Sequence, residues 1–170
     1  MRTLILLRHA KAERPEGAQS DEERRLTGRG RRDAEAAGAA IAAHGLAPAH
    51  APIKALISPA ARTRETAELA LAGFEAVRAI EDSLYHAAPA AIWQAFFDVP
   101  DERVIIIGHN PGLAELVSML IAQAHDNSPA ARDFMGHFPT AAWAAFELSG
   151  EIMRAAGPRL IAAWKPEKRD

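Results

Sequence analysis

The sequence predicts an α/β fold, a three-layer α/β/α sandwich with a mostly parallel central sheet. Short apolar runs alternate along the chain with longer segments of helical pattern, which is typical of a sheet between two layers of helices. The runs are nearly continuous in apolar character, as expected of parallel strands covered on both faces. With 170 residues and 49% apolar composition, the chain can bury one sizeable core, and we interpret residues 1–170 as a single domain.

The first third of the chain supplies a strand, a loop and a helix. Residues 2–7 form an apolar run that is followed at once by polar residues, which favours a buried strand. Residues 11–25 are polar and are predicted to form a loop. Thr27 can cap a helix that runs to about His44, where Gly45 stops it.

Two later helices are predicted to begin at a capping residue followed by proline, the residue that suits the first helical position. Ser58-Pro59 would begin a helix that runs to about residue 72, and Asn110-Pro111 would begin a second helix with apolar residues at helical spacing. After a loop at residues 127–139, two strands are expected to form an antiparallel pair at one edge of the sheet. The remaining elements are strands at 53–57, 75–80, 103–107, 142–148 and 159–164 and a helix at 89–97.

Two histidines share one local setting, because each follows the end of an apolar strand. The first strand delivers Arg8-His9, and the strand at 103–107 delivers Gly108 and then His109. The strand at 53–57 is followed by Arg62, one turn into the next helix. If the three strands are parallel, all four side chains emerge at the carboxyl edge of the sheet, where open α/β sheets place ligand crevices.

These residue types suit the binding of a phosphoryl group and attack on it. A neutral imidazole is a nucleophile, so His9 can attack phosphorus and carry the phosphoryl group transiently. Arg8 and Arg62 can present planar donor forks to the phosphoryl oxygens. His109 can add a further donor, and the helix after it points its positive end toward the same space. The other histidines that we considered, His44, His50 and His125, are interpreted as structural or solvated.

Composition excludes several classes of protein. The chain has no cysteine, which excludes disulfides, thiolate nucleophiles and cysteine-bearing zinc sites. The net charge of -2 and the mixed signs give no case for a nucleic-acid partner. No apolar run approaches the roughly 20 residues of a membrane helix, and the N-terminus lacks a signal-peptide pattern. We therefore expect a cytoplasmic protein without a membrane partner.

Taken together, the motifs resemble those of the histidine phosphatase superfamily, with its phosphoglycerate mutase-like fold, and among its members the small phosphohistidine phosphatases of the SixA type. The family's Arg-His-Gly triplet stands here as Arg8-His9-Ala10, and its Gly-His-Asn-Pro turn as residues 108–111. Further matches are a leucine-threonine pair followed by glycine, a Ser-Pro-x-x-Arg-x-x-x-Thr stretch, and a Pro-Thr-Ala before a strand. Their residues are Leu26, Thr27, Gly30, Ser58, Pro59, Arg62, Thr66, Pro139, Thr140 and Ala141.

The resemblance implies a two-step reaction without a metal or another cofactor. His9 would attack phosphorus and form a phosphohistidine that water then hydrolyses, while Arg8, Arg62 and His109 would bind the phosphoryl oxygens. Alanine at position 10 departs from the family's glycine. We expect this extra methyl to alter the packing of the loop and to leave the chemistry in place.

The general acid is the more consequential departure. Larger relatives place a glutamate in a Leu-x-Glu segment after the fourth strand, where it protonates an alcohol leaving group. The comparable stretch here, residues 83–87, has no carboxylate, so the candidates are Glu81, Asp82 and His86. An alkoxide leaves poorly without a proton, whereas the ring nitrogen of a phosphohistidine leaves readily. The missing acid therefore favours phosphohistidine or other P–N substrates.

Several alternatives remain open at this point. The nearest is a small-molecule phosphomonoester phosphatase of the same fold that uses Glu81 or His86 as its acid. A binding module without turnover would need the arginines but not the nucleophile His9. A mutase is disfavoured because the chain lacks enclosing insertions, and a zinc hydrolase because the two histidines follow separate strands without a carboxylate at ligand spacing. The expected partner is a phosphorylated protein or small molecule, and the oligomeric state stays open.

Overall fold

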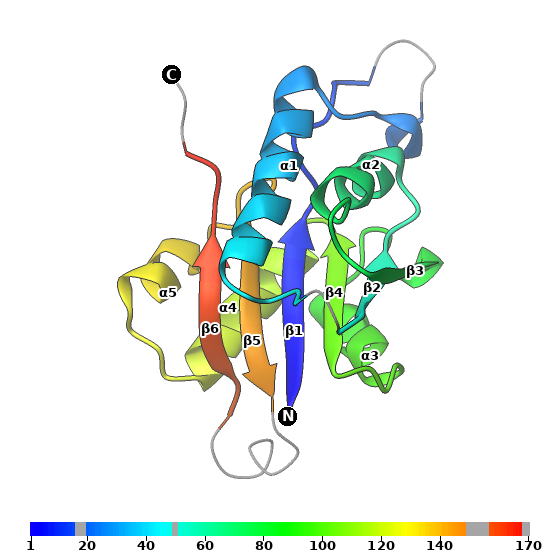
Figure 1. Cartoon of the computed structure of the whole chain (residues 1–170). Helices are drawn as coiled ribbons and strands as arrows, with labels where there is room; N and C mark the ends of the chain where they lie inside the picture. Colours follow the sequence, from blue (N-terminus) through cyan, green and yellow to red (C-terminus); the bar gives the residue numbers. More distant parts are fainter. Residues whose placement is uncertain (16–19, 49–50, 149–156, 168–170) are drawn as a thin grey trace.

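The computed structural model describes residues 1–15, 20–48, 51–148 and 157–167. These residues form one six-stranded sheet in the order β3-β2-β4-β1-β5-β6 (Figure 1). The first four strands in the chain run parallel to one another, and β5 and β6 add an antiparallel pair at one edge. Their bounds are β1 Arg2–Arg8, β2 Ile53–Ile57, β3 Ala76–Ile80, β4 Arg103–Gly108, β5 Trp143–Leu148 and β6 Arg159–Trp164.

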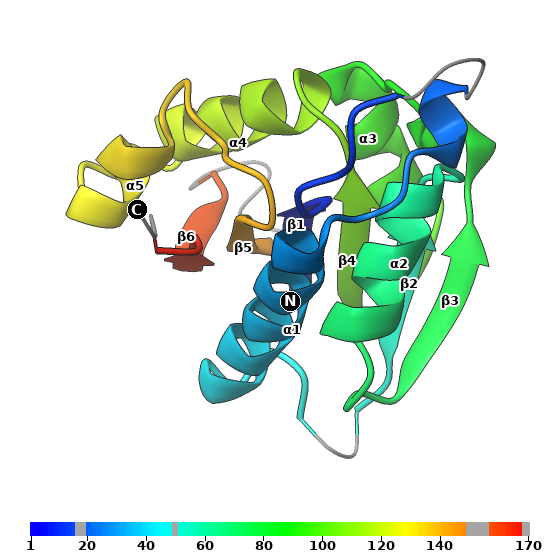
Figure 2. The same ribbon diagram turned by 90° about the horizontal axis from the view of Figure 1, so that it is seen from above.

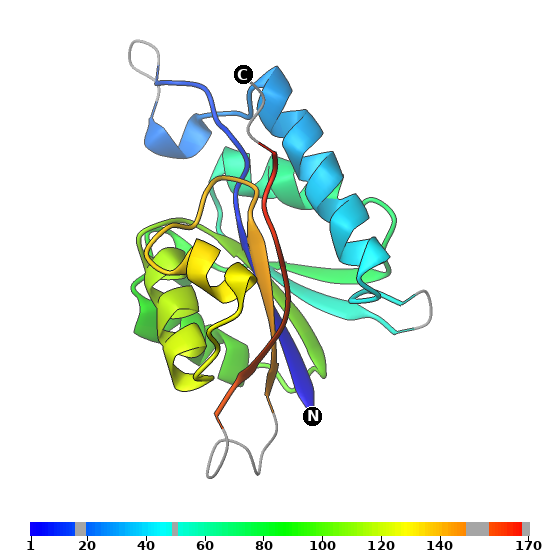
Figure 3. The ribbon, with the colours of Figure 1, turned by 90° about the vertical axis from the view of Figure 1, so that its left-hand side faces the viewer.

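Helices cover both faces of the sheet. Viewed from above, α1 (Gly28–Ala43) and α2 (Ala61–Ala70) lie on one face (Figure 2). The opposite face carries α3 (Pro89–Phe97), α4 (Gly112–Gln123) and α5 (Pro129–Phe134), as the side view shows (Figure 3). The predicted three-layer sandwich with a mostly parallel sheet is therefore confirmed.

Alternation along β1 divides the core between the two faces. Leu4 and Leu6 pack with apolar residues of α3, α4 and α5, whereas Ile5 and Leu7 pack with residues of α1 and α2. All four of these side chains are almost completely buried. This double burial explains why the strand is a continuous apolar run in the sequence.

Two predicted helix starts are wrong. The first turn of α2 begins at Ala61 after Ala60, and α4 begins at Gly112 after Pro111, in each case without a side-chain cap. Ser58 and Asn110 therefore do not cap these helices. The predicted cap of α1 is confirmed, because Thr27 Oγ1 accepts the Gly30 N–H at 2.9 Å.

The segment predicted as a loop at residues 127–139 contains α5, which is a further correction. Ser128 caps this helix by accepting the Ala131 N–H at 3.1 Å, and Pro129 is its first residue. The cap-plus-proline signal was thus present in the sequence, but the short helix lies between polar stretches that favoured a loop.

The sheet brings three strand ends together. In β1, Arg8 lies opposite Gly108 of β4, and β2 pairs with the other side of β4. Backbone hydrogen bonds continue beyond the strands, since His9 N–H donates to Gly108 O at 3.1 Å and Ser58 N–H donates to Ile107 O at 3.0 Å. The residues that follow β1, β2 and β4 are therefore fixed at one edge. Within the described ranges, no helix combines the length and apolar character needed to cross a membrane.

Candidate active site

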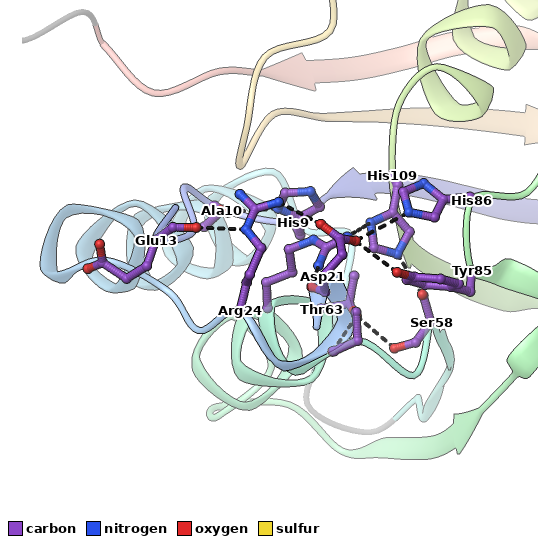
Figure 4. Close-up of polar contacts among 12 residues, drawn as sticks. His9, Ala10, Glu13, Asp21, Arg24, Ser58, Thr63, Tyr85, His86 and His109 are labelled. Atoms are coloured by element: carbon purple, nitrogen blue, oxygen red, sulfur yellow. Dashed lines mark hydrogen bonds and ion pairs between the residues drawn. The ribbon is translucent and has the colours of Figure 1, made fainter. Parts of the chain in front are cut away.

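The four predicted site residues do meet at the carboxyl edge of the sheet. The ring centroids of His9 and His109 lie 5.2 Å apart. Arg62 donates to His109, and the positive charges of Arg62 and Arg8 act on His9. Figure 4 shows His9 and His109 facing a group of polar side chains from several loops.

His9 has the hydrogen-bonding pattern of a nucleophile. Its Nδ1 lies 2.8 Å from the carbonyl oxygen of Ala10, and because a carbonyl can only accept, Nδ1 must carry the proton. The Nε2 lone pair of the neutral ring is then free to attack. Burial lowers the pKa of His9 to about 3, and the nearby His109, Arg62 and Arg8 lower it as well. The ring is therefore neutral at physiological pH.

His109 is bound at both ring nitrogens. A guanidinium can only donate, so Nδ1 accepts from Arg62 Nη2 at 3.3 Å. Nε2 carries the proton of the neutral ring and donates it to Ser58 Oγ at 2.6 Å. Burial, followed by the charge of Arg62, lowers the pKa of His109 to about 3. The expected donation to a phosphoryl oxygen stays a prediction. It requires either that Nε2–H breaks its hydrogen bond to Ser58 or that Nδ1 gains a proton.

Each arginine has one buried nitrogen that lacks a hydrogen-bond partner among the described residues. Arg8 donates from Nη1 to the carbonyl oxygen of Phe138 at 2.9 Å, and burial lowers its pKa. Arg62 is 2% exposed and donates to Asp21 and His109 through its terminal nitrogens. The Nε atoms of both side chains are buried and have no hydrogen-bond partner among the described residues. Buried donors without partners are costly, so a site with two of them favours an anion.

Thr66 joins α2 to the end of β1. Its hydroxyl donates to Arg62 O at 2.7 Å and accepts the Ala10 N–H at 3.0 Å, so α2 holds the loop that follows His9. Ala10 itself is fully buried and packs with Leu26, Ala34 and Ala141. The extra methyl is therefore accommodated within a small apolar cluster.

Asp21 is a site residue that the sequence analysis missed. Its Oδ2 accepts from Arg62 Nη2 at 2.8 Å and from the Tyr85 hydroxyl at 2.8 Å, and its backbone oxygen accepts from Arg62 Nη1 at 2.6 Å. Arg24 Nη1 donates to Oδ1 at 2.8 Å. Arg24, then Tyr85 and Arg62, hold the pKa of Asp21 well below its usual range. The only sequence signal was an acidic cluster close to a run of arginines, a pattern that is usually a solvated face.

The three candidate acids lie in different places. Glu81 lines a separate groove beside α3 together with Gln94 and Asp98, and Asp82 is exposed. Only His86 is shown in contact with the site, where its Nε2 lies 3.3 Å from Asp21 Oδ2. Its ring stacks on that of His109 at 5.2 Å with an interplanar angle of 30°.

The turn that carries His86 is held tightly. His86 has a positive φ of 49°, which is uncommon for a residue other than glycine. Gly112, at the start of α4, lies against the next residue of the turn, and a Cβ at this position would be 1.9 Å from Ala87 O. The turn therefore sits in direct backbone contact with α4.

Histidines and a carboxylate lie near one another at this edge, but not in an arrangement that could hold a metal ion. In the part of the chain that the structure describes, no group of three or more His, Asp or Glu residues is arranged to hold a metal ion. The partners of His9 and His109 are instead a carbonyl, a hydroxyl and a guanidinium.

Comparison with known proteins gives a consistent assignment. A family model of the histidine phosphatase superfamily (branch 1) matches residues 4–85. The structure of a candidate phosphohistidine phosphatase SixA from Nakamurella multipartitia is 31% identical and superposes with a TM-score of 0.79, covering 97% of this chain and 96% of that one. A search of curated proteins gave no match.

Two further structures share the fold. A candidate SixA from Agrobacterium tumefaciens has a TM-score of 0.78 at 24% identity and covers 97% of this chain and 99% of that chain. The protein histidine phosphatase SixA complexed with tungstate has a TM-score of 0.70 at 20% identity and covers 96% of each chain. The chain therefore belongs to the histidine phosphatase superfamily and is a phosphatase of the phosphoglycerate mutase-like fold.

Proposed function

We propose that this phosphatase hydrolyses phosphohistidine, or a related substrate with a P–N bond, through a covalent phosphohistidine on His9 and without a metal ion. The observation that carries this proposal is the state of His9. Its ring is neutral, and its Nδ1–H donates to the Ala10 carbonyl. Its neighbours Arg8 and Arg62 each have a buried Nε atom without a partner among the described residues.

In the first step, His9 Nε2 attacks phosphorus and the bond from phosphorus to the leaving nitrogen breaks. The electron pair of that bond stays on the leaving imidazole. The transferred group spreads its negative charge over three oxygens, so fixed cations lower the barrier. Arg8 and Arg62 supply these cations. In the second step, water attacks the same phosphorus, the bond from phosphorus to His9 Nε2 breaks, and its electron pair returns to the ring. His9 leaves as the neutral imidazole with its Nδ1–H still donated to Ala10 O, and the protons of the water stay on the phosphate or pass to solvent.

Among the described residues, no carboxylic acid is placed to protonate a leaving group, which favours a P–N bond. Glu81 lies beside α3, and Asp21, a carboxylate at the site, is held in its ionised form. An ionised carboxylate cannot protonate an alkoxide. General acid catalysis is typically worth about 10²- to 10⁴-fold, so alkyl phosphates lose that factor while phosphohistidine does not need it. The similarity to SixA-type structures supports the same substrate class.

One observation favours a second candidate function, a phosphomonoester phosphatase of the same fold. His86 is 53% exposed and lies beside Asp21, so it can bring a proton from solvent to a leaving oxygen. Solved structures of the same fold include a candidate α-ribazole-5'-phosphate phosphatase from Escherichia coli, at 16% identity with a TM-score of 0.64. That likeness shows the fold alone.

The test compares a phosphohistidine peptide with aryl and alkyl phosphates in the presence of a chelator. We expect rapid phosphate release from the peptide and acid-labile phosphate on the wild-type protein. Binding of the peptide without phosphate release would instead identify a binding module. Loss of activity with chelator, restored by added metal, would contradict the metal-free mechanism.

A further inference from the structure

Building on the proposed function, we infer that Asp21 is the leaving-group subsite. Its carboxylate accepts a hydrogen bond from the ring N–H of the substrate's phosphohistidine, on the nitrogen that does not carry phosphorus. Asp21 thereby selects an imidazole as the leaving group.

The position of Asp21 fits this role. It contacts Arg62 through two of the guanidinium nitrogens, and Arg62 in turn contacts His109, whose ring centroid is 5.2 Å from that of His9. The side chain of Asp21 is 42% exposed, whereas that of Arg62 is 2% exposed. Asp21 thus connects the buried Arg62 to solvent, and its carboxylate is accessible to the departing part of a substrate.

The charge of Asp21 is fixed by its neighbours. Donors from Arg24, Tyr85 and Arg62 reach its two carboxylate oxygens at 2.8 Å each. Hydrogen bonds and nearby cations of this kind stabilise the charged form of a carboxyl group. Asp21 is therefore an acceptor, and it favours a positively charged ring over a leaving group that bears negative charge.

The structure already contains an imidazole at this carboxylate. His86 Nε2 lies 3.3 Å from Oδ2, the longest of the contacts to that oxygen. Figure 4 shows this contact beside the one from Tyr85. An imidazole edge therefore reaches Asp21 from the solvent side, and a substrate ring can replace the half-exposed His86 there.

The proposed contact makes the phosphoryl transfer symmetrical. The phosphorylated ring of the substrate bears a proton on its second nitrogen and a positive charge. When His9 Nε2 forms its bond to phosphorus, the P–N bond of the substrate breaks, its electron pair returns to the ring, and neutral imidazole leaves with that proton. His9 becomes the cationic ring, and its own N–H is held by Ala10 O at 2.8 Å. Asp21 thus accepts the ring N–H of the substrate in the same way that the Ala10 carbonyl accepts the ring N–H of His9.

The experiment measures the leaving-group selectivity of Asp21→Asn with a phosphohistidine peptide and 4-nitrophenyl phosphate. The amide keeps the size of the side chain but loses its charge. Both substrates are expected to react more slowly, because Arg62 loses an ionic partner. The selectivity is kcat/KM for the phosphohistidine peptide divided by kcat/KM for 4-nitrophenyl phosphate. We expect this ratio to fall about 10-fold or more, since hydrogen bonds to charged groups are worth about 1.5–3 kcal/mol. Asp21→Glu should restore part of the ratio, and Glu22→Gln, an exposed neighbour in the same turn, should leave it unchanged.

The outcomes separate this inference from the function on which it rests. An equal loss with both substrates leaves the ratio unchanged; it would show that Asp21 only positions Arg62 and would overturn the subsite. In that case, wild-type hydrolysis of phosphohistidine would leave the proposed function standing. Failure of the wild-type protein to hydrolyse either substrate would overturn the function and the subsite together.

Discussion

His9 and His109 occupy equivalent places in the sequence, each just after a parallel strand, yet their rings are bound in opposite ways. His9 donates its ring N–H to a backbone carbonyl, and its other ring nitrogen has no protein partner among the described residues. His109 has both nitrogens occupied, one by Ser58 and the other by Arg62. A free lone pair suits attack on phosphorus, and two bound nitrogens suit the fixing of a ring in place. The partners of a histidine thus separate two roles that the sequence context cannot.

The comparison predicts its largest effect at His9. His9→Ala should abolish turnover and acid-labile phosphate labelling together, because the other buried imidazole at the site, His109, has both nitrogens bound. Loss of His109 should lower kcat more than it raises KM, since this ring is predicted to stabilise the transition state. Near wild-type turnover in a folded His9→Ala protein would reverse the two assignments.

Arg62 supplies the next effect, because it contacts His109 and Asp21 at once and is predicted to bind the phosphoryl oxygens. Arg62→Lys keeps the charge and loses the planar fork. We expect a loss of about 2 kcal/mol or more in transition-state stabilisation, by analogy with deletion of one oxyanion donor. The measurement is kcat/KM with an aryl phosphate. Equality with the wild-type protein would show that the fork is unnecessary.

Ser58 and Ser128 sharpen the comparison, because both are serines followed by proline. Ser58→Ala removes the acceptor of the His109 proton and leaves a buried donor unpaired, which costs about 1–3 kcal/mol. Its kcat should fall about 10-fold as the ring loses its fixed orientation. Ser128→Ala removes the cap of α5 and should lower the free energy of unfolding by about 1 kcal/mol without changing kcat. Chemical denaturation and steady-state kinetics on both variants check this contrast, and equal kinetics for the two would refute it.

The pH dependence gives a smaller effect that both histidines share. Each has a pKa of about 3 in the folded protein, against about 6.5 when unfolded. The unfolded chain therefore binds more protons below pH 6.5, so stability from these groups is present above that pH and is lost as the pH falls toward 3. The acid limb of kcat/KM, corrected for ionisation of the substrate, should lie well below pH 6. A limb near pH 6.5 that belongs to His9 would contradict the neutral, buried nucleophile.

The leaving-group preference is the finest test. Phosphoramidates and aryl phosphates should be hydrolysed well, and sugar phosphates poorly. Glu81→Gln should change this ranking little, because Glu81 lies in the groove beside α3. Fast hydrolysis of an alkyl phosphate that collapses in His86→Ala would instead identify His86 as a general acid.

Strand positions and the meeting of four side chains could be predicted because both depend on local pattern. A continuous apolar run marks a buried strand, and parallel strands share one edge. What could not be predicted depends on contacts across long stretches of sequence. Ser58 had the signature of a helix cap, but its hydroxyl is taken by His109, whereas Ser128 had the same signature and does cap its helix. The dipeptide favours a cap only where no buried partner competes for the hydroxyl.

Asp21 and Tyr85 illustrate the same limit. They are separated by a large part of the chain, and no periodicity or spacing connects them. Their contact depends on how the loop after His9 folds over α2. The acidic residues after β3 could be named as candidate acids, yet only the structure shows that Glu81 faces another groove while His86 lies beside Asp21.

Gly112 has a consequence for how the substrate range of this scaffold can change. The backbone of α4 lies against the carbonyl of Ala87. The turn that carries His86 therefore meets α4 at a position without a side chain that could be made smaller. Gly112→Ala would place a methyl group against that carbonyl and displace the turn that carries His86. A side chain at position 112 would thus alter the site indirectly, by moving the turn that carries His86 as a unit.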